Sequence, residues 1–179
     1  MPRTAMARFV GGETIWWTIA AAVVLADQAT KWVASELMCC RPPVAVTPFF
    51  NFVLAHNTGA AFSFLAQGSG WQRWFFAGIA AAAIAVISVL IRRRPGERLF
   101  CLGLALILGG AVGNLIDRVL WGHVVDFIQL HAAGWYFPAF NVADSAITVG
   151  AAVVVIDSFR TRAGAARQPT DPRGQGLRD

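Results

Sequence analysis

The stretch GGAVGNLIDR, residues 109–118, ends an apolar run that covers about residues 99–120. A helix of about 20 residues crosses the roughly 30 Å hydrocarbon core of a bilayer, and this run has that length. Its glycines predict a helix face on which neighbouring helices pack closely. Its last turns carry Asn114, Asp117 and Arg118, and polar groups near the end of a membrane helix are candidates for function.

Three further apolar runs have a similar length, at about residues 14–34, 71–91 and 137–159. Of the 179 residues, 56% are hydrophobic and 14% are charged. A soluble domain carries about a quarter charged residues. The sequence therefore predicts an all-α membrane protein with four transmembrane helices, in a polytopic membrane domain of residues 1–159.

The basic residues are distributed unevenly along the chain. Arginines cluster near the N-terminus, between residues 92 and 98, and from residue 160 onward. Because cytoplasmic segments carry the excess of basic residues, both termini are expected in the cytoplasm and segments 35–70 and 121–136 outside. The polar tail, 160–179, is expected to be disordered and cytoplasmic. This topology accounts for the net charge of +5, so no nucleic-acid partner is expected, although a basic tail is a place where polyanions bind.

The first outer segment is long enough to fold. Val44–Val46 and Phe49–Ala55 are rich in β-branched and aromatic residues and lie between prolines and Gly59, which predicts two short strands. The apolar stretch Gly59–Phe64 is expected to lie on the membrane surface. The expected fold is four membrane helices with a small extracytoplasmic β-containing loop domain and a surface-lying helical segment.

Two aspartates flank the last outer segment. Asp126 lies in GHVVDFI, residues 122–128, and Asp144 lies in FPAFNVADS, residues 137–145. A carboxylate in or beside hydrocarbon is costly, so each is a candidate functional group. Facing each other they would form an aspartic-protease dyad, in which one carboxylate takes a proton from water and the other, protonated, polarises the scissile carbonyl. The alternative is that Asp126 caps a turn and Asp144 pairs with Arg118.

Two further polar pairs are spaced four residues apart and therefore share a helix face. Asp27 and Lys31 are predicted either to neutralise each other near the membrane edge or to brace the site from the first helix. Asn114 and Arg118 are candidates for holding the main-chain carbonyls of a substrate, since arginine offers a fork of donors. Asp117 is expected to pair partly with these two neighbours.

No metal or cofactor is expected. The chain contains three histidines, at His56, His123 and His131. None occurs in the His-Glu-x-x-His spacing of a helical zinc site. Cys39 and Cys40 are adjacent, which makes them an awkward pair for a disulfide, and Cys101 lies within an apolar run. No disulfide framework is implied.

Five motifs follow one another along the chain, namely DQATK (27–31), NTGAAF (57–62), GGAVGNLIDR (109–118), GHVVDF (122–127) and FNVADS (140–145). Together they resemble the bacterial lipoprotein signal peptidase (signal peptidase II) family. Each motif alone is a weak signal. All five occur in the order found in that family, and the resemblance covers about residues 14–159.

The resemblance implies an aspartic endopeptidase of the bacterial inner membrane. Its substrates would be prolipoproteins, cut just before a cysteine that carries diacylglycerol, and globomycin-type cyclic peptides would inhibit it. By motif, the catalytic residues would be Asp126 and Asp144. The substrate site would be lined by Asn57, Asn114, Arg118 and Asn141. Supporting roles would fall to Asp27, Lys31 and Gly59. The protein is expected to act as a monomer in contact with membrane lipid, with its active site near the outer face.

The chain departs from the family pattern in a few places. Gln129 stands where an acidic residue is common, and the Cys39–Cys40 pair and the Arg-rich tail look peculiar to this chain. None of these features lies in the proposed dyad.

Two other functions fit the residues less well. An intramembrane protease of the presenilin kind would place an aspartate after the glycines of the third run, where this chain has Asn114. A proton-coupled transporter would use Asp27, Asp117 and Asp126 as relay groups along a path through the bilayer. The polar groups instead concentrate at the outer edge, and the inner halves of the runs are apolar.

Overall fold

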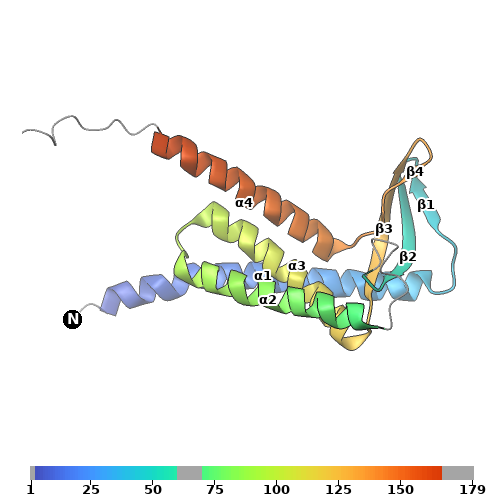
Figure 1. Ribbon diagram of the computed structural model, residues 1–179, viewed down its shortest axis with the longest axis horizontal. Helices are drawn as coiled ribbons and strands as arrows, with labels where there is room; N and C mark the ends of the chain where they lie inside the picture. Colours follow the sequence, from blue (N-terminus) through green and yellow to red (C-terminus); the bar gives the residue numbers. More distant parts are fainter. Residues whose placement is uncertain (1–2, 60–69, 167–179) are drawn as a thin grey trace, which may run out of the picture.

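The computed structural model describes residues 3–59 and 70–166, and this part of the chain forms helices and one antiparallel sheet (Figure 1). The elements in order are α1 (Arg3–Met38), β1 (Val44–Thr47), β2 (Phe50–Asn57), α2 (Trp71–Arg93), α3 (Arg98–Leu120), β3 (Val124–Ala132), β4 (Trp135–Tyr136) and α4 (Val142–Ala166). The sheet lies at one end of the helices, beside the end of α1 and the start of α4 (Figure 1).

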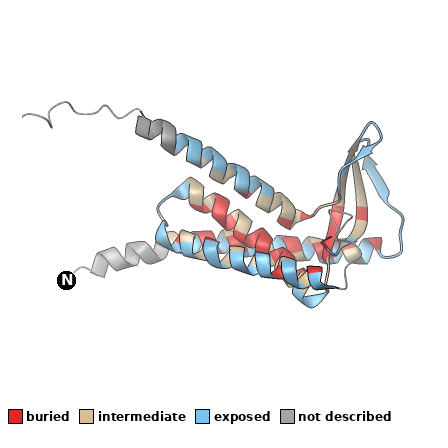
Figure 2. Ribbon diagram, in the orientation of Figure 1, coloured by how far each residue is buried: buried red, intermediate tan, exposed pale blue. Residues whose placement is uncertain are grey.

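Helix α3 is the centre of the fold and packs against α1, α2 and α4. Its small residues allow this, because a Cβ built on Gly109 would lie 2.7 Å from the Ala20 carbonyl oxygen of α1. A Cβ on Gly103 would lie 2.7 Å from the Gly150 carbonyl oxygen of α4. The close helix packing predicted from the glycines is therefore confirmed, and α3 carries much of the buried surface in Figure 2.

Three helices are long and apolar enough to cross a membrane, namely Trp71–Arg93, Arg98–Leu120 and Val142–Arg160. The outward faces of α2 and α4 are exposed although they carry large apolar side chains such as Ile79 and Val155 (Figure 2). Broad apolar surface of this kind is typical of contact with lipid. Helix α1 is longer than these three, but it contains the charged residues Asp27, Lys31 and Glu36.

The sheet has the strand order β1-β2-β3-β4, and all neighbouring strands are antiparallel. The two strands predicted within residues 44–55 are confirmed as β1 and β2. Strands β3 and β4 were not predicted, and they occupy the segment expected to be a short loop. In the register of β2 with β3, Ala55 lies opposite Asp126 and Asn57 lies opposite Val124.

The structure corrects the limits of two predicted segments. Helix α4 begins at Val142 instead of about residue 137, because the preceding segment contains Pro138 and because Phe140 forms a bridge to Ile128 of β3. The same helix continues to Ala166, where a disordered tail had been expected from residue 160. Residues 60–64 of the expected surface-lying segment and residues 167–179 of the tail lie outside the described part of the chain.

The contact between α3 and α4 can be tested at Gly103. Substitution Gly103→Ala would push the new methyl group against the Gly150 carbonyl, and overpacking of this kind costs about 1–3 kcal/mol. The thermal unfolding midpoint in detergent, followed by tryptophan fluorescence, should fall by about 2–12 °C. Gly78→Ala on α2 is the matched control, because its Cβ meets nothing within 4 Å, and it should leave the midpoint unchanged or raise it. Equal midpoints for both variants would contradict the close α3–α4 packing.

Candidate active site

Asp126 lies near the start of β3 and is 2% exposed. Its two carboxylate oxygens accept hydrogen bonds from the side-chain amides of Asn57, at 3.0 Å, and Asn141, at 2.7 Å. Burial raises the pKa of Asp126 to about 6, although the amide donors of Asn57 and Asn141 act in the opposite direction. A carboxyl group with this pKa holds or releases a proton near neutral pH, as acid–base catalysis requires.

Asp144 lies in the first turn of α4, where a reciprocal capping arrangement fixes it. The Asp144 backbone N–H donates to Asn141 Oδ1 at 2.9 Å, and the Asn141 backbone N–H donates to Asp144 Oδ2 at 3.3 Å. This is the capping-box pattern, with Asn141 as the N-cap and Asp144 three residues later. The side-chain amide of Asn114 donates to the other oxygen, Asp144 Oδ1, at 2.8 Å.

Asn141 connects the two aspartates. Its fully buried side-chain amide nitrogen donates to Asp126. Its side-chain oxygen Oδ1 accepts from the Asp144 backbone N–H, and its own backbone N–H donates to the Asp144 carboxylate. The Phe140 bridge to Ile128 joins the segment before α4 to β3, and this brings Asn141 beside Asp126. The two carboxylates therefore lie on either side of one asparagine, at the junction of β3 with α4.

A buried ion network of Lys31, Asp27 and Asp117 supports the junction of β3 with α4. The Lys31 ammonium lies 2.8 Å from Asp27 Oδ2 and 2.8 Å from Asp117 Oδ2, and it donates to Asn114 Oδ1 at 2.9 Å. All three charged side chains are at least 95% buried. Because Asn114 in turn holds Asp144, the Lys31 network positions one of the two candidate catalytic groups.

The network also holds the N-terminus of α4. Asp27 Oδ1 accepts a hydrogen bond from the Ala143 backbone N–H at 2.9 Å. The network has two carboxylates and one ammonium, which leaves one negative charge in excess. Helix N-termini carry partial positive charge and free N–H groups, so the N-terminus of α4 partly balances this negative charge. A Cβ on Gly113 would lie 2.5 Å from Asp27 Oδ2, so the glycine leaves room for this carboxylate.

The sequence predicted the Asp27–Lys31 pair, which is confirmed, but it missed the partner of Asp117. Asp117 pairs with Lys31 of α1, and no ion pair joins it to its neighbour Arg118 within the described residues. Gln28 was also missed. It donates to Asp117 Oδ1 at 2.9 Å and ties α1 to α3. Its signals in the sequence were its position next to Asp27 and its place in the DQATK motif.

Arg118 lies close to the site without pairing with either aspartate. Its Nη1 donates to the Asn114 backbone oxygen at 3.2 Å, and its guanidinium carbon lies 5.6 Å from the centre of the Phe76 ring. The alternative in which Asp144 forms an ion pair with Arg118 is not what the described residues show. The role of Arg118 in holding a substrate carbonyl stays a prediction.

Gly59 positions Asn57. Its backbone N–H donates to Asn57 Oδ1 at 2.9 Å, so the amide of Asn57 is turned toward Asp126. Gly59 has φ +102°, a conformation that favours glycine, and a Cβ there would overlap the Phe76 ring. Its predicted supporting role therefore has a geometric basis.

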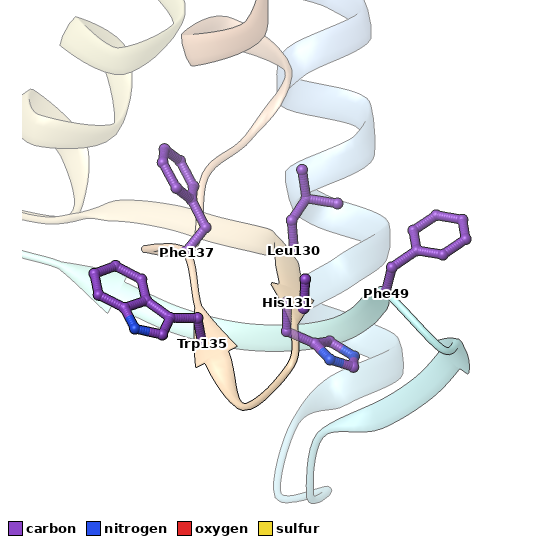
Figure 3. Close-up of a pocket in the computed structure, with 6 residues that line it drawn as sticks. Phe49, Leu130, His131, Trp135 and Phe137 are labelled. Carbon is purple, nitrogen blue, oxygen red and sulfur yellow. The ribbon is translucent and has the colours of Figure 1, made fainter.

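An apolar groove of about 400 Å³ opens beside Asp144. It is lined by Leu130, Phe137, Phe140, Asp144, Ser145, Thr148 and Val149. A second hollow of about 310 Å³ lies on the sheet between Phe49, Trp135 and the histidine His131 (Figure 3). The two hollows share Leu130 and Phe137, so a largely apolar surface leads from the sheet to one of the two carboxylates.

The described residues contain no group of three or more His, Cys, Asp or Glu side chains that could hold a metal ion. The rings of His56 and His123 lie 4.4 Å apart, but His131 stacks on Tyr136 instead of joining them.

Comparison with known proteins places this geometry in a family. The chain matches the family model described as signal peptidase (SPase) II over residues 19–160. It is 48% identical over 165 residues to a lipoprotein signal peptidase of Paraburkholderia phymatum, covering 92% of this chain and 99% of that relative. It is 54% identical over 145 residues to a lipoprotein signal peptidase of Janthinobacterium sp. (strain Marseille), covering 81% and 88%.

Two solved structures share the fold. Both are of bacterial membrane enzymes determined by the in meso method, at 2.3 Å and 1.9 Å resolution. They superpose with TM-scores of 0.75 and 0.69, at 30% and 32% sequence identity. In each case the likeness covers 88% of this chain and 95% of the solved chain.

Fold, site and relatives together define a bacterial membrane protease. The matched residues, 19–160, include every candidate site residue described above. The chain belongs to the signal peptidase II family, the lipoprotein signal peptidases that process prolipoproteins.

The buried network predicts a large effect of removing its one cation. Lys31→Met leaves Asp27 and Asp117 buried without their counter-ion, and breaking a buried pair in this way costs about 3–5 kcal/mol. Unfolding in detergent should occur at a clearly lower temperature or denaturant concentration. Glu97→Gln is the control, since it removes the exposed Arg94–Glu97 pair at 3.6 Å and should cost about 0–1 kcal/mol. A Lys31→Met protein as stable as the control would show that the network does not stabilise the fold.

Proposed function

We propose that this protein is an aspartic endopeptidase that removes signal peptides from diacylglyceryl-modified prolipoproteins, cutting just before the lipidated cysteine. The observation that carries the proposal is the pair of carboxylates, Asp126 on β3 and Asp144 on α4, held on either side of Asn141. Two aspartates that share a site and differ in environment are suited to hold one proton between them.

The environments of the two carboxylates support a division of roles. Asp126 is nearly fully buried and has a pKa of about 6, so it is the group that keeps the proton. Asp144 borders the apolar groove from which substrate would approach, and its carboxylate accepts hydrogen bonds from Asn114 and from the Asn141 backbone. Asp144 is thus the base and Asp126 the acid.

In the proposed reaction, Asp144 takes a proton from water as the water oxygen attacks the scissile carbonyl carbon. Asp126 gives its proton to the carbonyl oxygen, which yields a neutral tetrahedral intermediate. When the intermediate collapses, a proton moves from Asp144 to the leaving nitrogen and the C–N bond breaks. Asp126 recovers a proton from the intermediate, and the dyad returns to its starting state.

The substrate contacts follow from the groups around the dyad. The groove along Leu130, Phe140 and Val149 suits an apolar signal peptide or acyl chain. Arg118 and Asn114 are suited to hold main-chain carbonyls, and Asn57 and Asn141 border the reacting carbonyl through their contacts with Asp126. Globomycin-type cyclic peptides are expected to compete for this site.

The proposed topology has four membrane spans, with α1 as the first, in the bacterial inner membrane. The α2–α3 turn and the helix ends beside it carry four arginines, at 92, 93, 94 and 98, so this end faces the cytoplasm together with both termini. The sheet and the dyad then lie at the outer face, where Trp71, Trp121 and Trp135 are exposed at the level of the interface. We expect the monomer to be the active unit.

Replacing either aspartate tests the dyad. Asp126→Asn and Asp144→Asn each keep the size of the side chain but remove its acid–base function, so cleavage should fall by about 10²–10⁴-fold or more. The assay follows cleavage of a diacylglyceryl-modified prolipoprotein by purified protein in detergent, with and without EDTA. Asp157→Asn, farther along α4, is the matched control and should retain activity. Full activity in either dyad variant, or loss of wild-type activity in EDTA, would overturn the mechanism.

The pH dependence tests the role of Asp126. Because its proton is required, kcat/KM should fall about tenfold per pH unit as pH rises above its pKa of about 6. Asn57 donates to the ionised form and lowers this pKa, so Asn57→Ala should raise the pKa and move the alkaline limb to higher pH. The full profile of kcat/KM against pH measures the shift. If the alkaline limb of the Asn57→Ala profile stays in place or moves to lower pH, the proton required for cleavage is not the one on Asp126.

A further inference from the structure

Two adjacent cysteines lie in the turn that follows α1. The thiols of Cys39 and Cys40 are exposed, and their sulfur atoms are 3.6 Å apart, within the distance of an S–H···S hydrogen bond. Cys40 has φ +61°, a left-handed conformation that is uncommon for a residue other than glycine. The third cysteine, Cys101, is buried, and its thiol donates to the Arg94 carbonyl oxygen at 3.0 Å. The chain therefore contains one exposed dithiol and one protected thiol.

We propose that Cys39 and Cys40 form a redox-active pair that interconverts between two thiols and a vicinal disulfide. The sulfur atoms need only approach from 3.6 Å to the bond length of about 2.05 Å. Consecutive Cα atoms lie about 3.8 Å apart, below the usual disulfide range of about 4.4–6.8 Å, so the ring formed is strained. Strained and exposed disulfides are reduced more easily than structural ones, which suits a reversible pair.

The backbone on both sides holds the two thiols together. The Cys39 N–H donates to the Ser35 carbonyl oxygen at 3.1 Å, which continues the hydrogen-bond pattern of α1. The Arg41 N–H donates to the Met38 carbonyl oxygen at 3.0 Å and closes the turn. Pro42 and Pro43 follow and restrict the chain further. The turn thus keeps the sulfur atoms in contact without a covalent bond.

The pair is suited to thiol–disulfide exchange. The contact with Cys40, first as a hydrogen bond and then through its charge, raises the pKa of Cys39, and nearby Glu36 acts in the same direction. A raised pKa leaves less thiolate on Cys39 near neutral pH, so exchange through this thiol becomes faster as the pH rises. A disulfide donor, either a small molecule or a protein, is attacked by a thiolate of the pair to give a mixed disulfide. The second cysteine of the pair then attacks the mixed disulfide and releases the remaining donor thiol. The pair has then lost two protons and two electrons, and the donor has become two thiols.

The turn joins α1, which carries Lys31, to strand β1, which begins at Val44. The outward topology proposed above would expose the pair to the compartment in which disulfides form and persist. The chemistry of the pair itself rests on no step of the proposed peptidase reaction. A failure of the cleavage assay therefore leaves this inference untouched, and the reverse also holds.

The test uses the full chain, purified in detergent with EDTA and incubated with oxidised glutathione. The mass of the intact protein should fall by about 2 Da, the two hydrogen atoms lost on forming one disulfide. Alkylation with N-ethylmaleimide under denaturing conditions should then add one label, whereas the dithiothreitol-treated chain with its three cysteines should take three. Fragmentation should map the mass loss to residues 39–40, and dithiothreitol should restore both labels.

Three variants make the result specific. Cys101→Ser should keep the mass loss, whereas Cys39→Ser and Cys40→Ser should abolish it and accumulate a mixed disulfide with glutathione. Because the readout is a mass and a label count, a change in cleavage activity or stability cannot imitate it. A wild-type chain that ends as a stable glutathione adduct, as a disulfide-linked dimer, or unmodified would overturn the proposal.

Discussion

A buried lysine shared by two aspartates joins three helices at the level of the candidate site. Lys31 contacts Asp27 on its own helix and Asp117 on α3, and Asp27 continues to the first turn of α4 through the Ala143 N–H. None of these charges is stable in an apolar interior without its partners. The position of α4, and with it the position of Asp144, therefore depends on an ion network that includes neither catalytic candidate.

The two candidate carboxylates are held by different kinds of structure. Asp126 lies on a strand and is held by two amide side chains, whereas Asp144 lies in a helical first turn and is held partly by backbone N–H groups. Asn141 belongs to both environments, since its side chain contacts the first carboxylate and its backbone contacts the second. An amide does not ionise at any physiological pH, so it orders the pair without competing for the proton.

The sequence predicted what depends on local spacing or on length. The apolar runs, the Asp27–Lys31 pair and the two strands of the first outer segment followed from helical length, four-residue spacing and β-branched composition. The contact of Asp117 with Lys31 could not be predicted from local spacing, because it joins residues that are distant in the sequence. Strand β3 lies in the segment that the sequence predicts as a short loop, although residues 124–132 are as rich in β-branched and aromatic residues as β2. The start of α4 was recoverable, since the spacing of Asn141 and Asp144 is that of a capping box.

The order in which the ion network forms has a consequence for biosynthesis. A ribosome makes α1 first, so Asp27 and Lys31 enter the nascent chain four residues apart and can neutralise each other before any other helix exists. Asp117 can pair with Lys31 only when α3 has been made. Asp27 Oδ1 can accept its hydrogen bond from the Ala143 N–H only when α4 has been made. Because Asp144 lies on that same last helix, the proposed Asp126–Asp144 dyad is incomplete until α4 has been made. Under the proposed mechanism, a chain that lacks α4 would therefore have no peptidase activity in the membrane.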